Sequence, residues 1–173
     1  FYESLNFAIL KNLPSIFICE NNFYSVYTPL KERQITKINI AKRVSGLGIK
    51  SLRVDTHNWQ KVLKTLKYSR DYVIKNKKPI FLEFLTYRKY EHVGHVLDDH
   101  LKYRSKIEIN YWKKRDPLKN IYEYLIKNKI SKSKLEKINV EINKKITSAF
   151  IFAEKSKFPK PQDFKLHVFK KNL

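Results

Sequence analysis

Methionine is absent from this chain of 173 residues, and cysteine, glycine and proline are scarce. A single cysteine, Cys19, excludes an internal disulfide and favours a reducing, cytoplasmic setting. No apolar run approaches the roughly 18 residues that cross a bilayer, so we expect no membrane partner. Because the chain starts at Phe1 and its helical apolar pattern begins within the first few residues, we expect a fragment of a longer protein.

Acidic side chains are also few: there are 16 Asp and Glu against 37 Lys and Arg, and the formal net charge is +21. Such a charge, taken alone, favours nucleic acid or an anionic membrane surface. Only seven of the basic residues are arginine, the side chain best suited to read base edges. Because the lysines scatter over the expected helix faces, we favour a solvated surface and no nucleic-acid partner. A basic nucleic-acid-binding module is the alternative.

Helical and strand-like apolar spacing alternates along the first half of the chain, which is 42% apolar overall. Short buried strands that alternate with helices imply an α/β fold with a partial parallel sheet flanked by helices. The spacing predicts, in order, a helix over residues 2–12, a strand over 15–19, a helix over 38–44, a strand over 51–54, a helix over 58–75 and a strand over 80–85.

The C-terminal region is predicted to be helical. Asp116-Pro117 starts one helix, and Ser133-Lys134-Leu135-Glu136 is interpreted as a capping box that opens another. Pro159 and Pro161 end this last helix, and neither a repeat nor a linker is evident, so we expect residues 1–173 to form one domain. A buried stripe is expected along the last helix, formed by Leu135, Ile138, Ile142, Ile146, Ala149 and Ala153.

A polar motif, Cys19-Glu20-Asn21-Asn22-Phe23-Tyr24, follows the first expected strand. Parallel sheets bind ligands at the carboxyl ends of their strands. The Asn-Asn pair has an ordinary interpretation as a turn, because asparagine tolerates positive φ and bonds its own backbone. It also suits a hard cation, since magnesium prefers oxygen ligands and combines one or two protein groups with phosphate oxygens and water.

A long polar loop, residues 88–104, follows the last expected strand and holds three of the five histidines. Long loops at that edge of a parallel sheet are usually functional. His92 is therefore either a solvated residue or a catalytic one. The ordinary interpretation of Arg88 is that it orders the loop through carboxylates such as Asp98 or Asp99.

Several runs of this sequence together match one known pattern, and they extend over nearly the whole chain. They are Phe1-Tyr2-Glu3-Ser4-Leu5-Asn6-Phe7-Ala8, Leu13-Pro14, Ile16-Phe17-Ile18-Cys19-Glu20-Asn21-Asn22, Tyr24, Thr86-Tyr87-Arg88, His92, Asp98-Asp99, Tyr103-Arg104, Glu108, Trp112 and Arg115-Asp116-Pro117. The pattern resembles the alpha subunits of thiamine-diphosphate-dependent 2-oxo acid dehydrogenases that act on pyruvate, branched-chain 2-oxo acids or acetoin. The family motif opens with Gly-Asp-Gly, which is absent here and would lie upstream of Phe1.

The resemblance implies a thiamine-diphosphate-binding fold, with thiamine diphosphate and Mg²⁺ as cofactors. It implies that Asn22 by side chain and Tyr24 by backbone carbonyl bind the metal and the cofactor. His92 and Arg88 would lie at the cofactor, with His92 as the catalytic residue that stabilises charge or moves protons. Implied partners are a beta subunit, a second alpha subunit and a lipoyl acyltransferase, and the chain alone should be inactive.

Two departures from the family pattern leave the substrate open. Glu91 replaces the usual glycine, and Val93 stands where mitochondrial pyruvate enzymes have a regulatory serine, so kinase control is not implied. The implied reaction is oxidative decarboxylation of a pyruvate-like 2-oxo acid with acyl transfer to lipoamide. Alternatives are a related enzyme of acetoin or polysaccharide metabolism, and a non-catalytic remnant if Gly-Asp-Gly is missing upstream.

Overall fold

The computed structural model describes residues 1–35 and 37–165 of the chain. Their contacts divide the chain into two compact units, one from Phe1 to Glu123 and one that begins at Tyr124. The assignment of residues 1–173 to a single domain stays a prediction.

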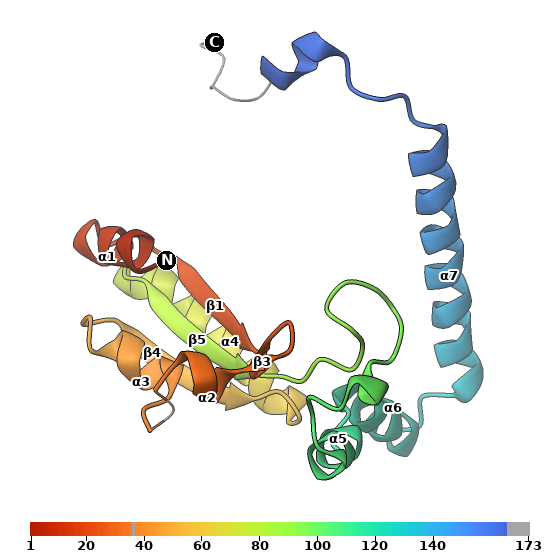
Figure 1. Ribbon diagram of the computed structural model, residues 1–173, viewed down its shortest axis with the longest axis horizontal. Coiled ribbons are helices and arrows are strands. Elements are labelled where there is room, and N and C mark those ends of the chain that lie inside the picture. Colours follow the sequence, from red (N-terminus) through yellow and green to blue (C-terminus); the bar gives the residue numbers. More distant parts are fainter. Residues whose placement is uncertain (36, 166–173) are drawn as a thin grey trace. The chain divides into compact units, whose positions relative to one another are not determined.

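A three-stranded parallel sheet forms the centre of the first unit (Figure 1) and confirms the expected α/β fold. The last strand in sequence is the central one in space. Asn21 and Asp55, the last residues of the two outer strands, both pair with Leu85, so all three strands end at one level. The strands, in spatial order, are β1 (Ile16–Asn21), β5 (Ile80–Leu85) and β4 (Lys50–Asp55).

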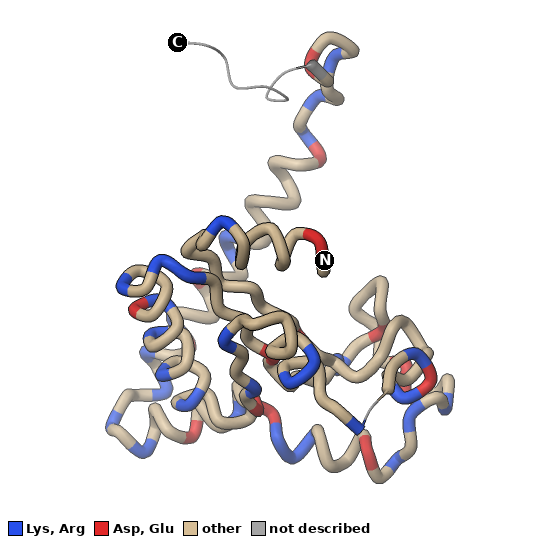
Figure 2. The backbone as a smooth tube through the Cα atoms, turned by 90° about the vertical axis from the view of Figure 1, so that its left-hand side faces the viewer, with Lys and Arg blue, Asp and Glu red and all other residues tan. Residues whose placement is uncertain are grey.

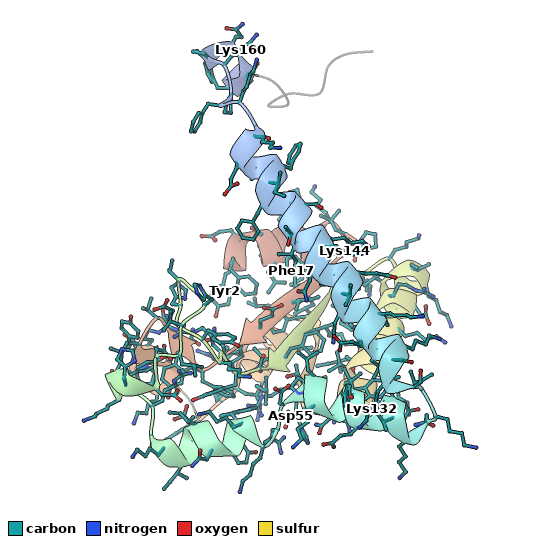
Figure 3. The ribbon with its side chains drawn as sticks, turned by 90° about the vertical axis from the view of Figure 1, so that its right-hand side faces the viewer. Tyr2, Phe17, Asp55, Lys132, Lys144 and Lys160 are labelled. Atoms are coloured by element: carbon teal, nitrogen blue, oxygen red, sulfur yellow. The ribbon has the colours of Figure 1, made fainter. Side chains whose placement is uncertain are left out.

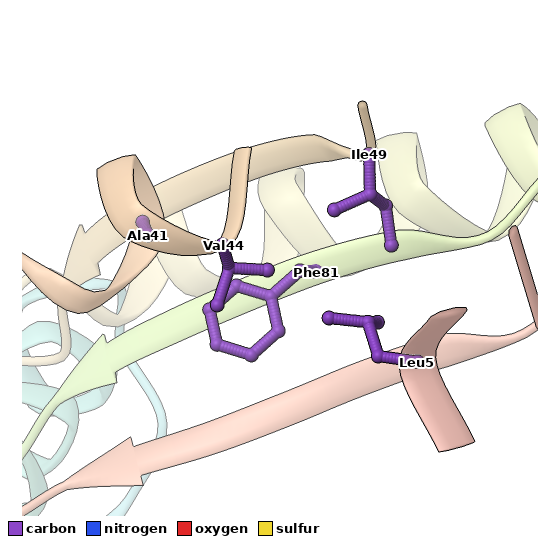
Figure 4. Packing of buried hydrophobic residues seen from close by; sticks show 5 residues of the cluster. All are labelled: Leu5, Ala41, Val44, Ile49 and Phe81. Atoms are coloured by element: carbon purple, nitrogen blue, oxygen red, sulfur yellow. The ribbon is translucent and has the colours of Figure 1, made fainter. Parts of the chain in front are cut away.

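Two helices, α1 (Tyr2–Leu10) and α3 (Ile40–Ser45), pack on one face of this sheet. Figure 4 shows the Phe81 ring of β5 among the side chains that these helices bring to it. Asn39 caps the start of α3 by accepting a hydrogen bond from the Lys42 amide. The buried cluster consists of Leu5, Ala41, Val44, Ile49 and Phe81.

The long helix α4 (Trp59–Asn76) packs on the opposite face. Its inward stripe contains Val62, Leu66 and Val73. Leu63 is 57% exposed because it lies one residue, about 100°, off that stripe. The alternate residues of β5, which are Ile80, Leu82 and Phe84, complete this second cluster.

The polar segment after β1 contains regular structure that the sequence did not predict. A two-stranded antiparallel hairpin and a one-turn helix lie there. Further along, the loop after β5 leads into a 3₁₀ turn and two helices. These elements are β2 (Tyr24–Ser25), β3 (Thr28–Pro29), α2 (Leu30–Arg33), η1 (Asp99–Leu101), α5 (Lys106–Lys113) and α6 (Pro117–Lys127).

The predicted capping box of the last helix is wrong by two residues. In the structure α7 (Lys132–Lys155) is capped by Ser131, whose side chain accepts a hydrogen bond from the Lys134 amide. Ser131 has the extended backbone of a cap, whereas Ser133 already lies inside the helix. A 3₁₀ turn, η2 (Pro161–Lys165), follows the helix.

The predicted buried stripe of α7 is also wrong for the described structure. None of the residues of α7 is buried, and Ile138, Ile142 and Ile146 are each nearly half exposed. An apolar stripe is buried only where another element packs on it. Figure 3 shows the side chains of α7, with Lys132 and Lys144 labelled, extending from the helix. Across residues 1–35 and 37–165, no helix combines the length and the apolar character needed to cross a membrane.

Candidate functional site

The asparagine pair after β1 forms two overlapping turns. The Asn21 Oδ1 accepts a hydrogen bond of 3.1 Å from the Phe23 amide, and the Asn22 Oδ1 accepts one of 2.9 Å from the Tyr24 amide. Phe23 has a φ of 67°, a left-handed conformation that few residues other than glycine adopt. The turn interpretation of this motif is confirmed. The second turn places the Asn22 amide oxygen 2.9 Å from the Tyr24 amide nitrogen, so these two residues lie side by side.

The donor set of this turn fits part of a magnesium site. A carboxamide oxygen has two lone pairs, so the bond from the Tyr24 amide leaves Asn22 Oδ1 able to bind a cation. Both candidate ligands, the Asn22 amide oxygen and the Tyr24 carbonyl, are neutral oxygens of the kind magnesium accepts beside phosphate. Within the described ranges, no group of three or more His, Cys, Asp or Glu could hold a metal. A magnesium ion bound at this turn would need negative charge from other groups, such as phosphate.

A buried carboxylate, Glu83, lies beside this turn in the middle of β5. Its side chain is 1% exposed, and its Oε1 accepts a hydrogen bond of 2.8 Å from Asn21 Nδ2. Its Oε2 accepts one of 2.8 Å from the Ala41 amide at the start of α3, and Arg53 Nε lies 3.4 Å from Oε1. Glu83 was not among the site residues predicted from the sequence. The available signal was one charged residue inside the apolar run Ile80-Phe81-Leu82-Glu83-Phe84-Leu85.

A cavity of about 690 Å³ opens next to Glu83. Tyr24 lines it, and its hydroxyl donates to the Glu108 carboxylate at 2.8 Å. Burial, reinforced by this hydrogen bond, raises the pKa of Tyr24 well above its ordinary value. The cavity wall also contains Asn21, Arg53, Tyr103, Ser105 and Trp112.

His92 is exposed in the loop after β5, and Arg88 holds it there. A guanidinium nitrogen of Arg88 lies 3.3 Å from Nδ1 of His92. Another nitrogen of the same guanidinium donates to the carbonyl of Val26 at 2.9 Å, two residues beyond Tyr24. Arg88 thus connects the loop that carries His92 to the segment that follows the asparagine turn, and the structure brings the two predicted motifs together.

The buried carboxylate of Asp98 contacts several other residues of the same loop. Its carboxylate is 1% exposed, accepts a hydrogen bond of 2.6 Å from the Tyr103 hydroxyl and forms an ion pair with Arg104. Arg88 lies 3.6 Å from the second carboxylate oxygen. The contact expected between Arg88 and a carboxylate of this loop is found at Asp98, and Asp99 pairs with Arg104 and Lys113 instead.

A second cavity, of about 320 Å³, lies beyond the carboxyl ends of β4 and β5. Tyr87 and Trp112 stack in its wall with ring centroids 5.2 Å apart and planes within 7° of parallel. Burial is the main cause that raises the pKa of Tyr87. Thr56, directly after β4, and Thr86, directly after β5, also line this cavity. In Figure 3, Asp55 marks the end of β4.

These features define an α/β protein with a polar site at the carboxyl edge of a parallel sheet. The chain belongs to the dehydrogenase E1 component family, whose model matches residues 1–162. It is 30% identical over 169 residues to the pyruvate dehydrogenase E1 component subunit alpha of Rickettsia bellii, which covers 97% of this chain. It is 35% identical over 168 residues, 96% of the chain, to the same subunit of Zymomonas mobilis. It is 36% identical over 164 residues, 92% of the chain, to the mitochondrial 2-oxoisovalerate dehydrogenase subunit alpha of Mus musculus.

These relatives are longer than the chain. The matched part makes up 51% of the Rickettsia bellii protein, 46% of the Zymomonas mobilis protein and 36% of the mouse protein. The chain therefore spans about half the length, or less, of the relatives it matches.

Proposed function

We propose that this chain is part of the alpha subunit of a thiamine-diphosphate-dependent 2-oxo acid dehydrogenase, which decarboxylates a 2-oxo acid oxidatively and transfers the acyl group to lipoamide. The observation that carries this proposal is the link made by Arg88. It joins His92 to the segment after the Asn22 turn, in a chain whose family match extends over residues 1–162. Both motifs that such a site needs are thereby connected at one edge of the sheet.

In the proposed site, the Asn22 amide oxygen and the Tyr24 carbonyl would hold Mg²⁺, and the metal would supply positive charge for the cofactor diphosphate. A charged ligand from outside these residues completes the metal site. Thiamine diphosphate, when bound, supplies the nucleophilic carbon and the electron sink that decarboxylation requires. The part of the protein is to place that group and to control charge and protons around it.

His92 would supply the proton chemistry. Arginine only donates hydrogen bonds, so Nδ1 of His92 must accept from Arg88, and the ring proton of the neutral imidazole is then on Nε2. An Nε2–H that points away from Arg88 can donate to an oxygen that gains negative charge during the reaction. Arg88 is a positioning residue in this scheme, because it orients the imidazole and its loop.

The substrate is proposed only as a class. Relatives of nearly equal identity carry pyruvate and 2-oxoisovalerate in their names, so both are candidates, as is acetoin. The proposed partners are a beta subunit, a second alpha subunit and a lipoyl acyltransferase, and the proposed compartment is the cytoplasm.

Calorimetric titration of the complete protein, assembled with its partner subunit, with thiamine diphosphate and Mg²⁺ tests the cofactor. Turnover of pyruvate, 3-methyl-2-oxobutanoate and acetoin with an artificial electron acceptor tests the substrate. We expect His92→Asn to lower turnover about 100-fold or more, as is typical for the loss of a general acid or base. His95→Asn, in the same exposed loop, is the matched control and should leave turnover unchanged. Wild-type turnover by the His92→Asn protein would contradict the catalytic role.

The abundant lysines keep a nucleic-acid-binding module as the rival to be tested. Figure 2 shows Lys and Arg distributed along helices and loops of the first unit. Electrostatic binding to nucleic acid weakens steeply as salt increases. Sequence-specific binding in a mobility-shift assay that survives physiological ionic strength would count against the dehydrogenase proposal.

A further inference from the structure

We propose that Glu83 is a positioning residue for the metal-binding turn, acting through Asn21; this inference rests on the proposed function. Glu83 Oε1 receives a 2.8 Å hydrogen bond from Asn21 Nδ2, and Asn21 Oδ1 receives one of 3.1 Å from the Phe23 amide. Asn21 is itself buried, at 7% exposure. The chain of contacts therefore runs from the central strand, through one side chain, into the turn that presents Asn22.

The carboxylate decides which way the Asn21 amide faces. An ionised carboxylate only accepts hydrogen bonds, so it must face the NH₂ group of Asn21 and leave the amide oxygen directed at the Phe23 amide. With the amide turned over, its NH₂ group would meet the Phe23 N–H, two donors facing each other, and its oxygen would meet the carboxylate. Glu83 thus selects the one amide orientation that supports the turn.

The position of the carboxylate is fixed from several sides. Glu83 is carried by the central strand, and its second oxygen accepts from the Ala41 amide in the first turn of α3. Arg53 of β4 lies within 3.4 Å and compensates the buried charge. Because β4, β5 and α3 all fix this group, Asn21 is held against a rigid support and not against a mobile surface side chain.

The turn needs such a support because its backbone is unfavourable. Phe23 has a φ of 67°, which a side chain as large as phenylalanine rarely adopts, so surrounding contacts must hold it. The Asn21 oxygen on the Phe23 amide is one of these contacts. The proposed ligands, Asn22 and Tyr24, flank Phe23, and a change at this residue displaces both.

Two substitutions break the link in different ways. Glu83→Gln replaces one acceptor by an NH₂ group, so either Asn21 Nδ2 or the Ala41 amide faces a donor. Asn21→Ala removes the link but leaves Glu83 with Arg53 and the Ala41 amide. The pair Asn21→Asp with Glu83→Gln reverses the direction of the hydrogen bond and keeps one carboxylate near Arg53, so it should restore the link.

The test is the affinity of the complete protein for Mg²⁺, titrated calorimetrically at saturating thiamine diphosphate, with no substrate present. We expect Glu83→Gln and Asn21→Ala each to weaken the affinity for Mg²⁺ at least tenfold. The reversed pair should recover to within threefold of wild type. Phe81→Leu is the matched control, because it weakens the core of the same strand two residues away. It should lower the melting temperature and leave the affinity for Mg²⁺ unchanged.

The possible results separate this inference from the proposed function. If the wild-type protein binds no Mg²⁺ with thiamine diphosphate, the proposed function fails. If the wild type binds and Asn21→Ala binds within threefold of it, the positioning role is wrong, whether or not Glu83→Gln folds. A loss of affinity that Phe81→Leu reproduces, or that the reversed pair does not repair, would also overturn the role, because it would reflect stability alone.

Discussion

Nδ1 of His92 lies 3.3 Å from a guanidinium nitrogen of Arg88, and the same guanidinium donates to the Val26 carbonyl and to the Tyr103 hydroxyl. Arg88 is largely buried, at 17% side-chain exposure, although His92 is exposed. The orientation of an exposed imidazole is thus set by an arginine that is anchored elsewhere. The proton chemistry proposed for His92 should therefore depend on Arg88.

The first prediction concerns the tautomer of His92. Because Arg88 can only donate, we expect the neutral ring to carry its proton on Nε2. Arg88→Met removes every donor while keeping a long side chain, and we expect a mixture of both tautomers. Long-range proton–nitrogen correlation spectra at pH 8 distinguish the two forms. The ring signals of His95 serve as the control, and an Nδ1–H form of His92 in the wild-type protein would contradict the assignment.

The second prediction concerns Asp98. Asp98→Asn leaves the Arg104 guanidinium, which is 2% exposed, without its buried counter-charge. Breaking such a pair typically costs about 3–5 kcal/mol, and we expect a loss near the lower end of that range because Asn still accepts a hydrogen bond. Urea unfolding followed by tryptophan fluorescence measures it, since Trp59 and Trp112 both belong to the first unit.

Asp99→Asn is the control for Asp98. Its carboxylate is 32% exposed and pairs with Lys113 at 3.0 Å, so its loss should cost no more than about 1 kcal/mol. Equal losses for the two variants would show that burial of Asp98 does not decide the stability of the loop.

The apolar pattern of the first half of the chain was sufficient to predict the sheet. Apart from Glu83, the run from Ile80 to Leu85 is apolar on both sides because β5 is the central strand of a sheet whose two faces are both covered. The helical spacing predicted a helix over residues 58–75, and the structure has α4 there. Because the strands were expected to be parallel, their carboxyl ends were expected to lie at one edge of the sheet. The turn at Asn22 and the loop at Arg88 were predicted there because polar residues directly follow strands.

What sequence reasoning missed depends on contacts between distant residues. Glu83 is 62 residues from Asn21, and nothing local indicates that the two side chains meet. The stripe of α7 has helical spacing, but spacing does not say what covers a helix, and its residues are exposed in the described structure. The cap of α7 was misplaced because Ser131 and Ser133 are equally good cap residues, and only the backbone distinguishes them.

The third prediction tests that cap. In a peptide of residues 129–158, Ser131→Ala should reduce helix content by circular dichroism, at a cost of about 1 kcal/mol. Ser131 accepts the hydrogen bond from the Lys134 amide, whereas Ser133 only touches the Ser131 hydroxyl at 3.1 Å. Ser133→Ala should therefore leave the helix nearly unchanged or strengthen it slightly, since alanine is the better helix former. The opposite order of effects would restore Ser133 as the cap.

The last prediction concerns stability at alkaline pH. Burial and the hydrogen bond to Glu108 raise the pKa of Tyr24 above the value of about 10 that the unfolded chain has. The folded state therefore holds this proton more tightly. The stability that Tyr24 contributes is fully present below about pH 10 and is lost as the pH rises toward its folded pKa.

Tyr24→Phe removes the hydrogen bond to Glu108 together with this pH dependence. We expect the variant to be about 1 kcal/mol less stable than wild type at pH 8, the usual net worth of such a bond. The difference should shrink as the pH rises above 10, because only the wild type loses the contribution of Tyr24. Urea unfolding between pH 8 and pH 11 measures the difference, with Tyr90→Phe, an exposed tyrosine, as the control. A difference that stays constant over this range would show that ionisation of Tyr24 is not coupled to folding.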